Sequence, residues 1–125
     1  MTILIVDDDP IAGEISQAII ESENYTTLLA EGAAEAGEIL ASHPEISAIV
    51  SDHHMPGMSG IAFYQSLSAT GPGLPFILLS GDEPATLISL APGIDAVVEK
   101  DGSLATSLPA TLARLLAGRD GERRP

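Results

Sequence analysis

Five short apolar runs, rich in Ile, Leu and Val, recur along the chain at intervals of roughly twenty to thirty residues. They are Thr2–Val6, Thr26–Ala30, Ala48–Ser51, Pro75–Leu79 and Ile94–Val98. Most of them are continuously apolar, which is typical of strands that are buried on both faces of a parallel sheet. A stretch that fits a helical period follows each run, so the sequence predicts alternating β-strands and α-helices.

The segments between these runs are predicted to be helices. Their predicted positions are a first helix from Pro10 onward, then Ala33–Ser42, Gly60–Ala69, Ala85–Leu90 and Leu104–Ala117. Pro10 suits a first helical turn, where a missing N–H breaks no helical hydrogen bond. In the first helix, Ile11, Ile15 and Ile19 recur on one face, and this face is predicted to pack on the core.

Consecutive β-α-β units place their strands in parallel with right-handed crossovers. We therefore expect an α/β fold with one open, doubly wound parallel sheet and helices on both of its faces. A chain of 125 residues suits one domain, predicted here as residues 1–118, followed by a polar C-terminal tail of residues 119–125. In sheets of this kind, ligands bind beyond the carboxyl ends of the strands.

Polar side chains of a few chemical types follow four of the predicted strands. They are Asp7, Asp8 and Asp9 after the first strand, Asp52 after the third, Ser80 after the fourth and Lys100 after the fifth. Because the carboxyl ends of parallel strands meet at one edge, these side chains are predicted to converge there. Lys100 is the only lysine in the chain, and its position indicates a partner for an anion. Asp9 is predicted instead to cap the helix that follows.

Carboxylates that are brought within several ångströms of one another repel, unless a cation joins them. Mg²⁺ suits such a set, because it binds carboxylate and carbonyl oxygens and leaves positions for phosphate oxygens. With a metal on Asp8 and Asp52, a free oxygen of Asp52 can attack a phosphorus atom. Lys100 and Ser80 would then stabilise charge on the phosphoryl oxygens. The sequence therefore predicts magnesium-dependent phosphoryl transfer to Asp52.

The composition argues against several other functions. Eighteen acidic residues against five basic ones give a formal net charge of −13, which repels nucleic-acid phosphates and anionic lipids. The chain has no cysteine, so it forms neither a disulfide nor a thiolate zinc site. No apolar run is long enough to cross a membrane, and no export signal follows Met1. We therefore expect no direct binding of nucleic acid or membrane, and a cytoplasmic location.

Four segments of the sequence, taken together, resemble the receiver domains of two-component response regulators. They are ILIVDDDP, AIVSDHHMPGMSG, FILLSG and AVVEK, and the resemblance covers residues 2–117. It implies a flavodoxin-like (βα)5 fold with strand order 2-1-3-4-5. It also implies a phosphoacceptor at Asp52, an acidic pair at Asp7 and Asp8, and the family's hydroxyl and lysine positions at Ser80 and Lys100.

The resemblance implies further parts of the site and its partners. The backbone carbonyl of His54 would complete the Mg²⁺ site, and His54 and Asp82 would tune the lifetime of the phosphorylated form. The phosphoryl donor would be a phosphohistidine on a sensor histidine kinase or phosphotransfer protein. Output would pass through an unknown downstream protein, and the chain would catalyse only its own phosphorylation and dephosphorylation, so it is not expected to be an enzyme.

The sequence departs from this family at two positions that matter for signalling. Val97 occupies a position where the family usually has Tyr or Phe, and Asp101 occupies one where proline usually follows the lysine. A pseudo-receiver, which binds partners but has weakened switching, is therefore an alternative. A second alternative is a phosphatase that resembles the haloacid dehalogenase superfamily, with Asp7 as nucleophile and Asp9 as acid.

Overall fold

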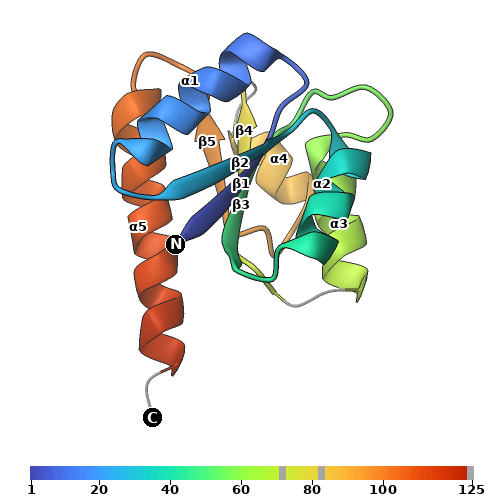
Figure 1. The fold of residues 1–125 in the computed structure, drawn as a ribbon. Coiled ribbons are helices and arrows are strands. Elements are labelled where there is room, and N and C mark those ends of the chain that lie inside the picture. The colour runs from blue at the N-terminus through green and yellow to red at the C-terminus, as the bar shows by residue number, and fades with distance from the viewer. Residues whose placement is uncertain (71–72, 82–83, 124–125) are drawn as a thin grey trace.

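A computed structural model of the chain describes residues 1–70, 73–81 and 84–123. Strands and helices alternate through these residues (Figure 1). The strands are β1 (Thr2–Val6), β2 (Thr26–Ala30), β3 (Ile46–Asp52), β4 (Phe76–Ser80) and β5 (Ala96–Glu99). The helices are α1 (Pro10–Glu21), α2 (Ala33–Ser42), α3 (Gly60–Thr70), α4 (Pro84–Leu90) and α5 (Leu104–Arg123). The predicted α/β class is confirmed.

The strands form one sheet in the order β2-β1-β3-β4-β5, and every neighbouring pair is parallel. This is the flavodoxin-like order that the resemblance implied. β2 lies on one side of β1, whereas β3, β4 and β5 follow on the other side, so the strand order reverses between β1 and β3. Open α/β sheets bind ligands at the carboxyl ends of the strands beside such a reversal.

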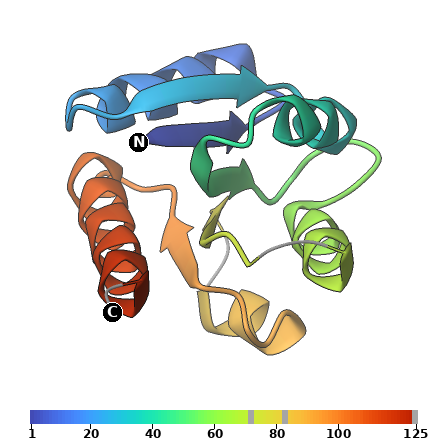
Figure 2. The same ribbon diagram turned by 60° about the horizontal axis from the view of Figure 1, so that its bottom comes forward.

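Helices cover both faces of the sheet, with α1 and α5 on one face and α2, α3 and α4 on the other (Figure 2). Successive residues of a strand point to opposite faces. Ile5 therefore packs in the same core as Leu112 of α5, whereas the next residue of β1, Val6, packs in the same core as Phe63 of α3. Burial of both faces explains why most of the strand sequences are continuously apolar.

Most of the predicted bounds agree with the structure to within two residues, but the end of α5 does not. This helix continues to Arg123, six residues past the end predicted at Ala117. Arg and Glu are good helix formers, and each of the two glycines in this extension, Gly118 and Gly121, costs about 1 kcal/mol without ending the helix. The predicted tail is therefore helical as far as Arg123, and the domain boundary at residue 118 stays a prediction.

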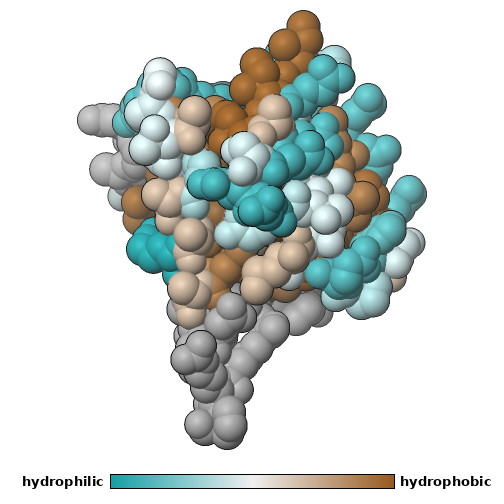
Figure 3. All heavy atoms as spheres, turned by 60° about the vertical axis from the view of Figure 1, so that its left-hand side comes forward, coloured by the Kyte–Doolittle hydropathy of each residue, from teal (hydrophilic) through white to brown (hydrophobic). Residues whose placement is uncertain are grey.

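The face of α1 that packs on the sheet differs from the predicted one. Ile11 and Ile15 are 69% and 53% exposed, whereas Gly13 and Ile20 are buried. Gly13 permits close packing, because a Cβ atom there would lie 2.9 Å from the Leu29 side chain. A search for large apolar residues cannot find a face that is built partly from small ones. Apolar surface is visible at the top of the side that bears α1 and α5 (Figure 3).

Candidate functional site

The carboxyl ends of β1 and β3 position the acidic residues. Val6 lies opposite Ser51 in the sheet, so Asp7 and Asp52 follow a matched pair of positions. The Asp7 N–H donates to the carbonyl of Ala30 on β2, at 3.0 Å. Because backbone bonds fix the strand ends on both sides, the sheet itself sets the spacing of the two carboxylates.

Three carboxylates lie together at this edge, on Asp7, Asp8 and Asp52. One ligand oxygen from each residue lies within 4.8 Å of the others. Asp7 is 2% exposed and Asp52 is 7% exposed, whereas Asp8 is open to solvent. Oxygen ligands of this kind suit a hard divalent cation, and two buried acids beside one exposed acid leave the solvent side open. The triad therefore fits a metal site typical of receiver domains.

Lys100 lies against the two buried acids. Its Nζ atom is 2.8 Å from Asp52 Oδ1 and 3.3 Å from Asp7 Oδ2. The Lys100 N–H donates to the carbonyl of Ser80 at 2.9 Å, which anchors the start of the β5–α5 loop beside the end of β4. Burial acts to lower the pKa of Lys100, but the ion pairs with Asp52 and Asp7 act in the opposite direction and leave its pKa raised.

The pKa of Asp7 is raised, and the largest cause is burial. The Asp52 carboxylate adds to this effect by repulsion. The Asp9 N–H, which donates to Asp7 Oδ1 at 2.9 Å, and the Lys100 ammonium both oppose it without reversing it. The charged form of Asp7 is thus disfavoured even with Lys100 beside it, and a bound cation would favour it.

Asp9 has a structural role, as predicted. Its Oδ1 atom accepts from the N–H groups of Ile11 at 2.9 Å and Ala12 at 3.4 Å, which caps α1. The side chain is exposed and is committed to the first turn of the helix. The phosphatase alternative needs this carboxyl as an acid, so the cap argues against it.

Ser80 and His54 belong to strand ends at the same edge of the sheet as the triad: Ser80 ends β4, and His54 follows β3. Ser80 is the last residue of β4, is fully buried, and lies one position beyond Leu79, the partner of Asp52 in the sheet. His54 lies on the loop that leaves β3 and is exposed. A phosphoryl contact from Ser80 and a metal contact from the His54 carbonyl both stay predictions. Asp82 lies outside the described residues.

The loop between β5 and α5 shows what replaces the usual proline. Asp101 Oδ1 accepts from both the N–H and the hydroxyl of Ser103, at 2.9 and 2.6 Å. These bonds lower the pKa of Asp101 and form a turn that leads into α5. Among the described residues every peptide bond is trans, including the one after Lys100. Val97 is partly buried in the core under α2, α3 and α4.

Gly60 is a supporting residue that the search for polar side chains missed. It begins α3 and is buried, and its N–H donates to the His53 carbonyl at 2.9 Å. A Cβ atom at this position would lie 2.5 Å from the backbone oxygen of Asp52 and from the Leu78 side chain. Only glycine permits this approach, which fixes the loop after Asp52. The signal in the sequence is the glycine itself, at the first position of a predicted helix.

Taken together, a doubly wound parallel sheet with three carboxylates and a lysine at its carboxyl edge defines a class of α/β domain that is built to hold a cation and an anion. The family model described as "Response regulator receiver domain" matches residues 3–110. The chain belongs to this family, and it is a receiver domain of two-component signalling.

Curated relatives support this assignment. The chain is 28% identical over 122 residues to the transcriptional regulatory protein GlrR of Escherichia coli K12, which covers 87% of this chain and 27% of that protein. It is 32% identical over 116 residues to the response regulator MprA of Mycobacterium ulcerans, which covers 92% of this chain and 48% of that protein. The chain thus spans less than half the length of either regulator.

Solved structures agree. The signal receiver domain of a signal transduction histidine kinase from Syntrophus aciditrophicus superposes with a TM-score of 0.82 at 32% identity, covering 99% of this chain and 94% of that one. A response regulator receiver domain protein from Clostridium thermocellum gives a TM-score of 0.84 at 20% identity, covering 95% and 96%, and this likeness shows the fold alone. Within the described residues, no helix is long and apolar enough to cross a membrane.

Proposed function

We propose that this receiver domain accepts a phosphoryl group on Asp52 from a phosphohistidine, in a reaction that requires Mg²⁺. The observation that carries the proposal is the position of Asp52, which belongs to the acidic triad and also contacts the ammonium group of Lys100. Its Oδ1 atom is 2.8 Å from Lys100 Nζ, and its carboxylate shares the triad with Asp7 and Asp8. A nucleophile beside a cation site and a fixed positive charge is what acceptance of a phosphoryl group needs.

Each residue of the site would have a separate role in phosphoryl transfer. An oxygen of Asp52 forms a bond to phosphorus while the bond from phosphorus to the donor imidazole nitrogen breaks, and the electron pair of that bond returns to the nitrogen. The Lys100 ammonium and the Ser80 hydroxyl stabilise the charge on the phosphoryl oxygens. Asp7, Asp8, Asp52 and the His54 carbonyl would hold Mg²⁺, which supplies further charge stabilisation and orientation when it is bound.

The proposed partners follow from the family and from the charge of the chain. A sensor histidine kinase or a phosphotransfer protein would supply the phosphoryl group, and a downstream protein would read the result. The net charge of −13 argues against direct binding of nucleic acid by this domain. We infer a cytoplasmic location, and no turnover beyond the domain's own phosphorylation and dephosphorylation.

A direct test uses acetyl phosphate, which needs no knowledge of the partner. We expect the intact mass of the wild-type protein to increase by one phosphoryl group when Mg²⁺ is present, and not when a chelator removes it. Asp52→Asn should abolish the gain. Asp95→Asn is a matched control, because it makes the same chemical change in an exposed acid at the far end of the sheet. Equal labelling of Asp52→Asn and wild type would refute the proposal.

The structure around Val97 and Asp101 favours a second candidate, a receiver that is phosphorylated but relays the event weakly. Val97 carries neither a ring nor a hydroxyl that could change partners, and Asp101 holds the loop after Lys100 through two bonds with Ser103. Amide exchange with and without beryllofluoride separates the candidates. Weak relay predicts slower exchange in the loops around Asp52 and no change over α4, whereas a change over α4 contradicts it.

A further inference from the structure

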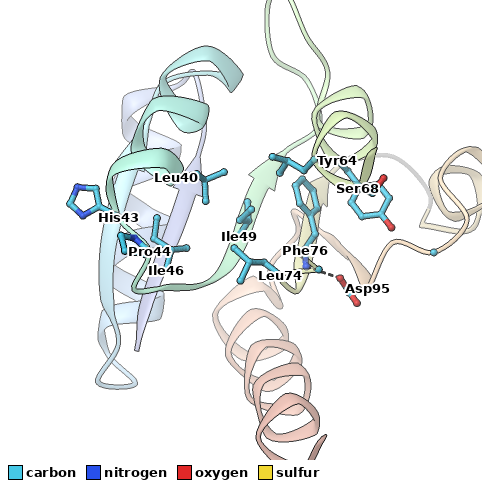
Figure 4. Close-up of a pocket in the computed structure, with 13 residues that line it drawn as sticks. Leu40, His43, Pro44, Ile46, Ile49, Tyr64, Ser68, Leu74, Phe76 and Asp95 are labelled. Carbon is cyan, nitrogen blue, oxygen red and sulfur yellow. Dashed lines mark hydrogen bonds between the residues drawn. The ribbon is translucent and has the colours of Figure 1, made fainter. Parts of the chain in front are cut away.

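An apolar cavity lies at the end of the sheet opposite to the acidic site, between α2 and α3 (Figure 4). Its volume is about 490 Å³. The apolar part of its lining includes Leu40, Ile46, Ile49, Leu67, Leu74 and Phe76. Ile46 and Phe76 are the first residues of β3 and β4, whereas the acids follow the carboxyl ends of their strands. The cavity is therefore separate from the phosphoacceptor site.

The size and the lining of this cavity match a site for a small molecule. Ligand pockets in proteins have volumes of roughly 300–1,000 Å³, with mostly apolar walls and a few polar groups that orient the ligand. The rings of Tyr64 and Phe76 meet edge to face, with centroids 5.2 Å apart, and provide an aromatic wall. Gly93 lies beside this wall, and a Cβ atom there would come within 3.3 Å of Tyr64 Oη.

Apart from His43, the polar side chains that line the cavity lie at one end of it. Figure 4 shows Tyr64, Ser68 and Asp95 on one side and Leu40 and Ile46 on the other. The Phe76 N–H donates to Asp95 Oδ2 at 2.8 Å, which orients this carboxylate and leaves its second oxygen for another donor. The lining is thus amphiphilic, with an apolar end and an acceptor-rich end.

The charges around the cavity select the kind of ligand. Of the described residues that line it, none is Lys or Arg. The ring of His43 points away from the cavity, and its Nδ1 atom is 2.8 Å from Glu45 Oε2. A carboxylate at the polar end and a net charge of −13 disfavour an anion and favour a cation, which Tyr64 can also stabilise through its ring.

We propose that this cavity binds a small amphiphilic amine, with its aromatic or aliphatic body against Leu40, Ile46 and Phe76 and its ammonium group near Asp95 and Tyr64. Because the cavity and Asp52 lie at opposite ends of the strands, binding should occur equally in the Asp52→Asn variant.

The test compares 2-naphthylmethylamine with 2-naphthoate, which present similar ring systems with opposite charge. Titration of the isotope-labelled wild-type protein, followed by amide chemical shifts, should show saturable binding of the amine that shifts Leu40, Ile46 and Leu74. The naphthoate should bind roughly tenfold more weakly or not at all. Shifts that do not saturate, or that spread over the acidic surface without those residues, would overturn the proposal.

Two variants and a matched control make the result specific. Ser68→Trp should fill the cavity from the exposed surface of α3 and abolish binding of the amine, while Gln65→Trp, an exposed position on the same helix outside the lining, should leave it unchanged. Asp95→Asn should remove the preference for amine over naphthoate. Unaltered binding in Ser68→Trp, or an unaltered preference in Asp95→Asn, would contradict the proposed site. If a variant fails to fold, the chemical shifts of the wild-type protein still show whether the amine binds in the cavity.

Discussion

The balance of charge at the site depends on a few residues. Asp7 and Asp52 are both buried, and Lys100 is the one ammonium group in contact with them among the described residues. The raised pKa of Asp7 shows that this arrangement disfavours the ionised carboxylate. A cation bound at this site would stabilise the protein, because it binds the folded state and not the unfolded one.

We predict that Asp7→Asn stabilises the metal-free protein at neutral pH. A carboxyl with a raised pKa binds its proton more tightly in the folded state, so its contribution to stability is greatest at low pH and is lost as the pH rises through the folded pKa. Removing the charge should raise the free energy of unfolding at pH 7 by about 1 kcal/mol, which corresponds to a rise of about 4 °C in the thermal midpoint. The gain should shrink as the pH falls toward about 4.

Thermal unfolding in a chelator and in millimolar MgCl₂ provides the check. Mg²⁺ should stabilise wild type more than Asp7→Asn, since the variant has lost one carboxylate of the triad. Asp9→Asn is the matched control, because it removes the same charge two residues away while asparagine still caps the helix. If Asp7→Asn lowers the midpoint in the chelator, the charge balance described for this site is wrong.

At the scale of elements, α1 is the helix whose sequence was most misleading. The prediction of a helix was correct, but the prediction of its buried face was wrong: Ile11 and Ile15 are exposed, whereas Gly13 and Ile20 are buried. Ile11 and Ile15 lie one helical turn apart, so their exposed side chains are neighbours on the surface of α1. α1 begins three residues after Asp7, so this exposed face lies on the element next to the phosphoacceptor site.

We predict that Ile11→Ala combined with Ile15→Ala slows phosphoryl transfer from a protein donor by roughly tenfold, which corresponds to a joint contribution of about 1.4 kcal/mol from the two side chains to binding of the donor. A donor histidine has to reach Asp52, so the donor protein must cover the surface beside it. Alanine suits an exposed helix position, so stability should be retained. The measurement is the rate of transfer from an autophosphorylated sensor kinase that phosphorylates the wild type.

Two comparisons make the α1 test specific. Labelling by acetyl phosphate should be unchanged in the α1 variant, because that donor needs no docking surface. Ile88→Ala combined with Leu90→Ala on α4 removes residues of comparable exposure, 49% and 59%, and should leave the transfer rate intact. Slower acetyl phosphate labelling in the α1 variant would mean that the substitutions damage the site itself.

For the whole molecule, the fold and the convergence of Asp7, Asp8, Asp52 and Lys100 at one edge of the sheet were predictable from the sequence, whereas the contacts between these residues were not. Buried parallel strands carry a strong apolar signal, and a residue that follows such a strand has a known edge of the sheet. That rule placed Asp52 and Lys100 at the same edge. It could not give the 2.8 Å ion pair between them, since the conformation of a long lysine side chain depends on packing that no local pattern records.

Sequence patterns could not predict three other features: the cavity, the end of α5 and the packing of α1. The cavity between α2 and α3 depends on how two helices that are distant in sequence are spaced on the sheet, and no single segment encodes that spacing. The continuation of α5 to Arg123 was missed because glycine and charged residues resemble a frayed tail. The packing of α1 was missed because Gly13 contributes by its lack of a side chain.

The central claim is that Asp52, and not another acid of the triad, receives the phosphoryl group. Borohydride reduction of the protein after treatment with acetyl phosphate and Mg²⁺ converts a phosphorylated aspartate to homoserine, and peptide mass analysis locates it. We expect homoserine at position 52. Homoserine at Asp7, Asp8 or Asp9, or phosphate retained on His53 or His54 with Asp52 intact, would contradict it.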